Sequence, residues 1–224
     1  MHHRVDLPDW AVARGRVLNE VTRLVPAATA LVVIDMQNVF LAPGEVFGNP
    51  YALGIVPRVN RAVAAFREAG ATILWTRQTV DHTPPRAMPA WQYDLSIPEV
   101  RAAVEAMVHG TRSHALHDAM EPAAGDLVID KYRYGAFSCP EGALERALAE
   151  HSIDTILIVG TLTNCCCDST AREANMRGLR VLLLSDATAA ASDAEHNAAL
   201  LLLRLNFADI CTTDEAIRRL QGPA

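Results

Sequence analysis

Residues 155–187, TILIVGTLTNCCCDSTAREANMRGLRVLLLSDA, contain two apolar runs on either side of one helical pattern. The runs at residues 155–160 and 180–187 are continuously apolar rather than alternating, which is typical of strands covered on both faces. Between them, residues 165–177 have the spacing of a helix, and Gly178 suits the position just after its end. Strand, helix and strand in this order predict two parallel strands joined by a crossover.

Four more apolar runs lie outside this segment, at residues 29–35, 71–77, 126–131 and 208–213 (TALVVID, ATILWTR, DLVIDK and ADICTT). Helical patterns lie between the runs, at residues 56–69, 141–150, 193–205 and 214–220. A regular alternation of strand and helix is typical of a parallel sheet with helices on both faces. The sequence therefore predicts the α/β fold class, as a three-layer, doubly wound, Rossmann-like sheet of about six mainly parallel strands.

The length of the chain is enough for one well-buried core, because 50% of its 224 residues are hydrophobic. We expect a single domain over residues 29–224, preceded by an N-terminal arm, residues 1–28, with one helix at about residues 10–21. Residues 78–125 interrupt the alternation with five prolines and are predicted to form an insertion or lid. Long irregular segments in compact α/β domains often cover a functional site.

The composition argues against several classes of function. The formal net charge is −6, so the chain lacks the basic surface that binds nucleic acid or anionic lipid. Its longest apolar runs fall far short of the roughly 20 residues that span a bilayer. The N-terminal residues lack the apolar core of a secretory signal, so we expect a cytoplasmic protein. Five cysteines, three of them adjacent at 165–167, do not suit a secreted disulfide framework and favour reduced thiols.

Three chemically active side chains follow predicted strands. Asp35 ends the first strand, Lys131 ends the third, and Cys166 follows the fourth at the start of a helix. In an open parallel sheet, ligands bind at the carboxyl ends of the strands near a topological switch point, so we expect these side chains to converge. Lys131 is also the only lysine of the chain, and unlike Arg it can lose its proton where its surroundings lower its pKa. Codon bias towards arginine is the plain alternative.

The three side chains suit acyl transfer through a thioester. The thiolate is the nucleophilic form of Cys, and a helix N-terminus and a nearby ammonium are expected to lower the pKa of Cys166. Asp35 can take the thiol proton and deliver it to a leaving nitrogen. Backbone N–H groups of residues 160–166 can hold an oxyanion. Alternatively, Asp35 has a structural role and caps a turn at the end of its strand.

Three segments around these residues closely resemble the isochorismatase-like cysteine hydrolases, in particular their ureidoacrylate and N-carbamoyl amidohydrolase branch. They are VVIDMQNVF (32–40), GDLVIDKYRYGAF (125–137) and GTLTNCCCDSTAREANMRGLRVLLLSDATAA (160–190), and the likeness extends over about residues 29–217. Three separate motifs in the right order make the resemblance specific.

The resemblance implies roles for individual residues. The family pattern of Gly, two residues, Thr, two residues and Cys makes Cys166 the nucleophile, with Asp35 and Lys131 as the other members of a catalytic triad. It also implies a cis peptide bond between Thr161 and Leu162. The backbone N–H groups of Leu162 and Cys166 would then form the oxyanion hole.

The resemblance bears on metal binding as well. Metal-dependent nicotinamidases of the family carry an Asp and two His after the second strand, whereas here Asp81 and His82 are adjacent and no second His is near them. We therefore expect neither a metal nor another cofactor. The remaining cysteines are expected to fill space in the core; they are Cys139, Cys165, Cys167 and Cys211. Three histidines near the insertion are expected to be solvated; they are His109, His114 and His117.

Five residues are predicted to contact the substrate: Gln78, Trp91, Tyr134, Phe137 and Asn164. Gln78 ends the second strand, where its amide can bond to an amide or ureide. Tyr134 and Phe137 follow the third strand at the family spacing of pocket aromatics, with core packing as the alternative. Asn164 lies beside the nucleophile, and fixing the turn is its alternative role. Trp91 lies in the insertion, where it is expected to set the specificity together with Gln92 and Tyr93.

These observations favour a hydrolase that cleaves a C–N bond of a small amide, carbamoyl or ureide substrate through a thioester at Cys166. One alternative is an isochorismatase, which hydrolyses a vinyl ether by acid catalysis without a thiol. The other is an inactive binding protein of the same fold. We expect a small-molecule substrate and no nucleic-acid or membrane partner. Residues 197–205 are apolar around most of the helix, which predicts a homodimer or homotetramer.

Overall fold

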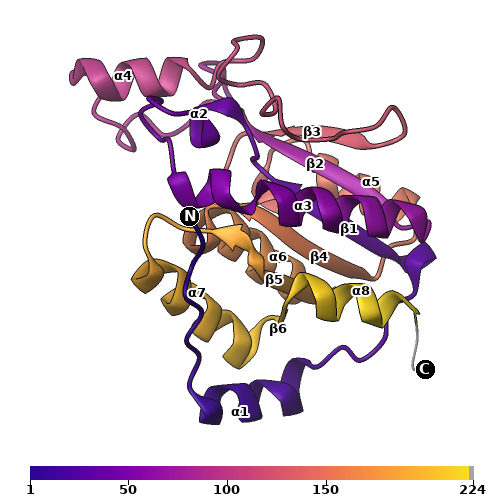
Figure 1. Cartoon of the computed structure of the whole chain (residues 1–224). Coiled ribbons are helices and arrows are strands. Elements are labelled where there is room, and N and C mark those ends of the chain that lie inside the picture. Colours follow the sequence, from indigo (N-terminus) through magenta and orange to yellow (C-terminus); the bar gives the residue numbers. More distant parts are fainter. Residues whose placement is uncertain (222–224) are drawn as a thin grey trace.

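The computed structural model describes residues 1–221 and contains one six-stranded sheet whose strands are all parallel (Figure 1). Its order is β3-β2-β1-β4-β5-β6. The α/β fold and the six strands predicted from the apolar runs are therefore confirmed. The last three residues of the predicted domain, 222–224, lie outside the described residues. The strands are β1 (Thr29–Ile34), β2 (Thr72–Gln78), β3 (Leu127–Lys131), β4 (Thr155–Thr161), β5 (Arg180–Ala189) and β6 (Asp209–Cys211).

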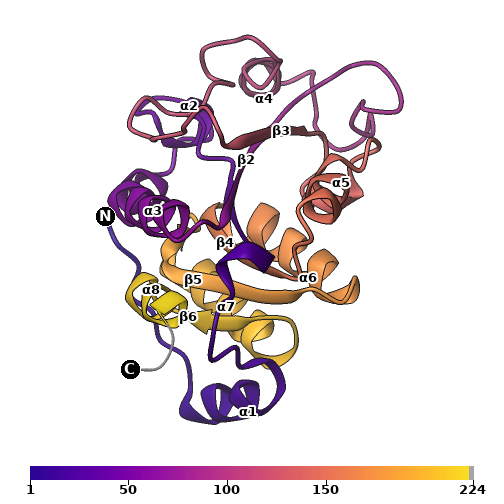
Figure 2. The same ribbon diagram turned by 90° about the vertical axis from the view of Figure 1, so that its right-hand side faces the viewer.

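Helices cover both faces of the sheet, as Figure 2 shows. One face packs against α3 and α8, and the other against α5, α6 and α7, each face with its own apolar core. The longest helix, α3, begins at Pro50 rather than at residue 56, because the Asn49 side chain caps it by accepting from the Tyr51 N–H. The helices are α1 (Asp9–Asn19), α2 (Asn38–Leu41), α3 (Pro50–Glu68), α4 (Pro98–Glu105), α5 (Ala143–Glu150), α6 (Asp168–Met176), α7 (Asp193–Asn206) and α8 (Thr213–Gln221).

The direction of winding reverses between the neighbouring strands β1 and β4. The chain moves from β1 to β2 and β3 on one side, and then returns to β4, β5 and β6 on the other. At the carboxyl end of this pair, Ile34 lies opposite Gly160. Strand order 3-2-1-4-5-6 creates a crevice at this point, where ligands of doubly wound sheets bind. The topology thus places the residues that follow β1 and β4 side by side.

The N-terminal arm crosses the end of the sheet and packs α1 along α7. Gly15 of α1 lies directly against Arg204 of α7, whose guanidinium forms a buried ion pair with Asp209. Part of the apolar surface of α7 is therefore covered within the chain, while Leu202 stays half exposed. Association into a dimer or tetramer remains a prediction.

The insertion between β2 and β3 has more order than its prolines suggest. It contains α4, and its Val80, Val104 and Met107 form a small core with Val39 of α2. The Arg133 guanidinium holds its first loop by donating to the carbonyl oxygens of residues 85 and 86. Among residues 1–221, no helix combines the length and apolarity needed to cross a bilayer.

Candidate active site

Asp35 follows β1 in a left-handed backbone conformation, with φ of 49°. Asp adopts this conformation more readily than most residues, and such local strain often occurs at functional sites. The Thr76 hydroxyl of β2 donates to Oδ1 of Asp35 at 2.8 Å. No hydrogen-bond donor among the described residues satisfies Oδ2, although the Lys131 ammonium lies next to it. The Oδ2 atom therefore keeps a lone pair available for a proton.

Lys131 is completely buried at the end of β3, and its Nζ atom lies at the centre of the site. Nζ is 2.8 Å from Oδ2 of Asp35 and 3.4 Å from Sγ of Cys166. It also donates to Gln78 Oε1 at 2.6 Å and to the Arg133 carbonyl oxygen at 3.1 Å. Burial alone would lower the pKa of Lys131, but the Asp35 carboxylate and Cys166 outweigh it and raise that pKa. The site therefore holds Lys131 as an ammonium, and the loss of a proton that distinguishes Lys from Arg is not favoured here.

Cys166 lies in a single wide π-helical turn, residues 163–167, and α6 begins only at Asp168. The turn closes because the N–H groups of Cys165 and Cys167 both donate to the Leu162 carbonyl oxygen, each at 3.1 Å. A cis peptide bond joins Thr161 to Leu162, as the resemblance predicts. The sequence pattern predicts a regular helix from residue 165 and misses this turn. Wide turns of this kind are frequent at functional sites.

The Cys166 thiol is only 7% exposed. A hydrogen bond with Cys165 and burial raise the pKa of Cys166 well above its ordinary value, and the Asp35 charge adds to this, while Lys131 opposes it. The expected lowering of this pKa is therefore not found. The half-buried Cys165 receives the opposite effect, since its hydrogen bond with Cys166 lowers its pKa. A neutral Cys166 thiol is the resting form that these interactions favour.

Two tyrosines join the insertion to the segment that follows β3. The hydroxyl of Tyr93 lies 3.0 Å from the hydroxyl of Tyr134. Burial is the largest cause that raises the pKa of Tyr93, and this hydrogen bond adds to it.

The other residues predicted to contact the substrate lie in different surroundings. Gln78 is buried and reaches Lys131 through its Oε1. Phe137 packs in the same apolar core as Cys166, with the Arg177 guanidinium over its ring. Trp91 is 84% exposed, and Asn164 is exposed within the nucleophile turn. Their contact with a substrate, like that of Tyr134, remains a prediction, as does the oxyanion hole.

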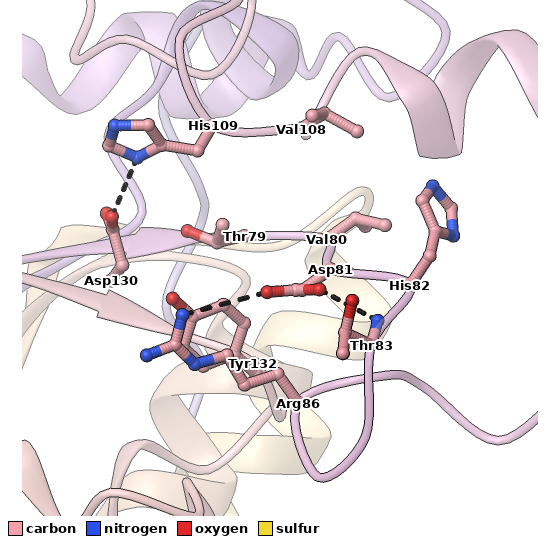
Figure 3. A pocket seen from close by; sticks show the side chains of 10 residues that line it. All are labelled: Thr79, Val80, Asp81, His82, Thr83, Arg86, Val108, His109, Asp130 and Tyr132. Atoms are coloured by element: carbon pink, nitrogen blue, oxygen red, sulfur yellow. Dashed lines mark hydrogen bonds and ion pairs between the residues drawn. The ribbon is translucent and has the colours of Figure 1, made fainter.

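A cavity of about 550 Å³ lies between the insertion and the ends of β2 and β3, and Figure 3 shows its lining. His109 and Asp130 lie at its edge, and with His114 they bring three potential metal ligands within 4.8 Å of one another. All three already have protein partners. Asp130 pairs with Arg77 at 2.7 Å and with His109 at 2.9 Å, and His114 bonds to Thr79 at 2.8 Å. We interpret this group as an ion-paired cluster that anchors the insertion to β3.

Sequence reasoning missed several residues that hold the site together. Thr76 supports Asp35, and the Gln37 side chain joins β2 to the insertion through the backbone of Gln78 and His114. His196 of α7 bonds to Thr163 at the start of the nucleophile turn. A histidine just before the apolar run of residues 198–203 is the one signal in the sequence that points to His196.

A sequence profile described as the Isochorismatase domain matches residues 29–215 of the chain. A ureidoacrylate amidohydrolase, RutB, of Methylobacterium radiotolerans is 32% identical over 213 residues, which cover 86% of this chain and 80% of that one.

Two solved structures extend the likeness to the fold. A cysteine hydrolase from Pseudomonas syringae pv. phaseolicola superposes with a TM-score of 0.80 at 26% identity, over 91% of this chain and 97% of that one. An N-carbamoylsarcosine amidase from Thermoplasma acidophilum gives a TM-score of 0.66 at 25% identity, over 83% and 96% of the two chains.

Proposed function

This chain belongs to the isochorismatase family of hydrolases, and from that premise we propose that it is a cysteine-dependent amidohydrolase. Its substrate would be a small amide, carbamoyl or ureide compound. One observation carries the proposal: a buried ammonium, Lys131 Nζ, lies 2.8 Å from the Asp35 carboxylate and 3.4 Å from the Cys166 thiol. Acyl transfer from nitrogen requires an acid–base group and a nucleophile. Here both groups lie next to the same ammonium.

The proposed reaction begins with attack of Sγ of Cys166 on the substrate carbonyl carbon, as the thiol proton moves to Asp35. Negative charge develops on the carbonyl oxygen, where the Leu162 and Cys166 N–H groups would stabilise it. Asp35 then protonates the nitrogen, and the C–N bond breaks. Ammonia or an amine leaves, and the acyl group stays on Sγ of Cys166 as a thioester. Water attacks the thioester as Asp35 accepts its proton. The C–S bond then breaks, the proton returns from Asp35 to the Cys166 sulfur, and the acid product leaves.

The raised pKa of Cys166 fits this order of events, because the proton leaves the thiol only when the attack begins. Lys131 keeps its charge throughout and stabilises whichever of its two neighbours is the anion. The names of the relatives support a carbamoyl or ureide substrate, since ureidoacrylate and N-carbamoylsarcosine both carry such a group. Cys166 separates this proposal from vinyl-ether hydrolysis, which needs an acid but no thiol.

The test measures release of ammonia or amine from a panel of ureides, N-carbamoyl amino acids and small amides. Cys166→Ala and Cys166→Ser should lose about 10³-fold or more of the activity, because removal of a nucleophile abolishes the covalent route. Cys211→Ala is the matched control, since Cys211 is a free, buried thiol of β6, and it should keep the native rate. Rapid acid quenching should trap an acyl group on the Cys166 peptide.

Conversion of isochorismate by the Cys166→Ala variant, with no release of ammonia or amine by the native protein, would instead assign the chemistry to Asp35 acting as an acid.

A further inference from the structure

His3, near the start of the N-terminal arm, is buried next to the element that supports the nucleophile turn. Its ring lies between the rings of Tyr51 of α3 and His196 of α7, with centroid distances of 4.0 and 4.1 Å and nearly parallel planes. The side chain is 2% exposed. Three segments that are far apart in the sequence therefore meet at one imidazole ring.

The hydrogen bonds of His3 indicate its protonation. The Ala190 N–H donates to Nε2 at 3.0 Å, so Nε2 carries a lone pair and the ring proton is on Nδ1. Nδ1 then donates to Oδ1 of Asp193 at 2.7 Å. The arm continues along the start of α7, where the Asp6 N–H donates to Asn197 at 2.7 Å. His3 is thus neutral and bonded at both nitrogens.

The same reasoning connects His196 to the nucleophile turn. Nε2 of His196 donates to the Ser185 carbonyl oxygen at 3.1 Å, so Nδ1 is free to accept from the Thr163 hydroxyl at 2.9 Å. Thr163 is completely buried and begins the turn that carries Cys166. Only a neutral His196 can accept this hydrogen bond. Burial is the largest cause that lowers the pKa of His196 to about 4, which keeps the ring neutral.

We propose that His3 is a positioning residue for the nucleophile turn, an inference that rests on the proposed role of Cys166 as the nucleophile. The His3 ring fills the space between Tyr51 and His196 and thereby excludes water from His196. It leaves Nδ1 of His196 available to Thr163. The N-terminal arm is in this way part of the support of the active site.

Removal of the His3 ring should change the titration of His196. Water would enter beside His196 and solvate its charged form, so its pKa would rise towards the ordinary value. The groups that face His196 are His3 of the arm, Asp193 of α7, the Ser185 carbonyl of β5 and the Thr163 hydroxyl. Of these only Asp193 would remain charged, and it favours protonation as well. A protonated His196 could no longer accept from the Thr163 hydroxyl, so this hydrogen bond would have to reverse, with Nδ1 as the donor.

The experiment compares three variants of the full chain. His3→Ala removes the ring and both hydrogen bonds, whereas His3→Phe keeps a flat ring between Tyr51 and His196. His2→Ala is the matched control, because His2 is the neighbouring histidine and its contact is with Arg58 on the surface. The readouts are kcat and KM between pH 5 and 8 for the hydrolysed amide or ureide, and amide hydrogen exchange of residues 163–167.

His3→Ala should lower kcat at neutral pH about tenfold with KM changed less than twofold, since a small displacement of a reacting group is enough for such a loss. The acid limb of its pH profile should move up by about one pH unit, and the turn should exchange faster. His3→Phe should keep the native acid limb, and His2→Ala should match the native protein in every readout.

The proposal would be overturned if His3→Ala matched His2→Ala in kcat, acid limb and exchange, or if the acid limb of His3→Phe moved as far as that of His3→Ala. If the native protein hydrolysed none of the compounds, the proposed function would fail. Exchange of residues 163–167 would still test the support that His3 gives to the turn.

Discussion

The Nζ atom of Lys131 lies 2.8 Å from Oδ2 of Asp35, and neither side chain is exposed to solvent. Removing both charges from water has a large desolvation cost, which their attraction only partly offsets. Such a pair is weak evidence for a stabilising role. The position of the pair next to the Cys166 thiol indicates a chemical role. The pair places a proton acceptor, Asp35, and a cation, Lys131, where a thiolate must form.

Lys131→Met should destabilise the protein by about 3–5 kcal/mol, because it leaves the Asp35 carboxylate buried without its counter-ion. The double variant Asp35→Asn/Lys131→Met removes both charges and should lose less stability than Lys131→Met alone. Urea unfolding measures both values. Arg16→Met is the control, since it breaks an exposed pair with Glu20 and should change stability by less than about 1 kcal/mol. Equal losses for the single and double variants would show that Asp35 is not charged in the native site.

Cys165→Ala should lower the pKa of Cys166, because the hydrogen bond with Cys165 is the largest effect that raises it. Alkylation by iodoacetamide, followed by mass spectrometry of the Cys166 peptide at a series of pH values, measures the midpoint. Cys167→Ala is the control, since the buried Cys167 thiol packs in the core and should leave this midpoint unchanged. An unchanged or higher midpoint in Cys165→Ala would contradict the interpretation.

Gly160→Ala tests the close approach of β1 and β4 beside the nucleophile turn. A Cβ atom at Gly160 would collide with the carbonyl oxygen of Ile34, and the φ of +112° at Gly160 is unfavourable for any other residue. Gly110→Ala separates the two effects, because Gly110 also has a positive φ but open space around it. Strain alone should cost about 1–2 kcal/mol at Gly110, and Gly160→Ala should lose more than about 3 kcal/mol in urea unfolding. Similar losses would mean that the strands can separate without cost.

Most of the fold follows from local patterns in the sequence. Continuous apolar runs identify all six strands because most of them are buried on both faces, although β3 at the edge is only partly buried. Strand ends place Asp35, Lys131 and Cys166 at one edge. The support of the site is not local. His3 meets Asp193 across 190 positions, and Tyr93 meets Tyr134 across 41, through irregular segments with no periodic pattern. Nothing in the residues near either partner predicts such contacts.

Local propensity also fails where tertiary contacts decide the conformation. The turn at residues 163–167 has a helical pattern, but the two N–H groups that share the Leu162 carbonyl widen it. The sequence predicts that Trp91 contacts the substrate, yet the structure leaves it exposed, whereas Tyr93, which is expected to set specificity with it, bonds to Tyr134. The side of the insertion that faces inward depends on the small core around Val104 and not on composition.

Stability should fall as the pH is lowered from 7 to 5. Burial lowers the pKa of both His114 and His196 to about 4, against about 6.5 in an unfolded chain. In this window the unfolded chain therefore binds protons that the folded protein does not, which makes unfolding more favourable. The loss is at most about 2 kcal/mol for each histidine between pH 7 and pH 5, and urea unfolding at the two values measures it. Carboxylates titrate lower and contribute little here.

His196→Gln should remove about half of this dependence, because Gln does not titrate. His151→Gln, at an exposed position, should keep all of it. If native protein and His196→Gln lose the same stability between the two pH values, His196 is not held neutral by burial. The hydrogen bond from Thr163 would then have no role in holding the nucleophile turn.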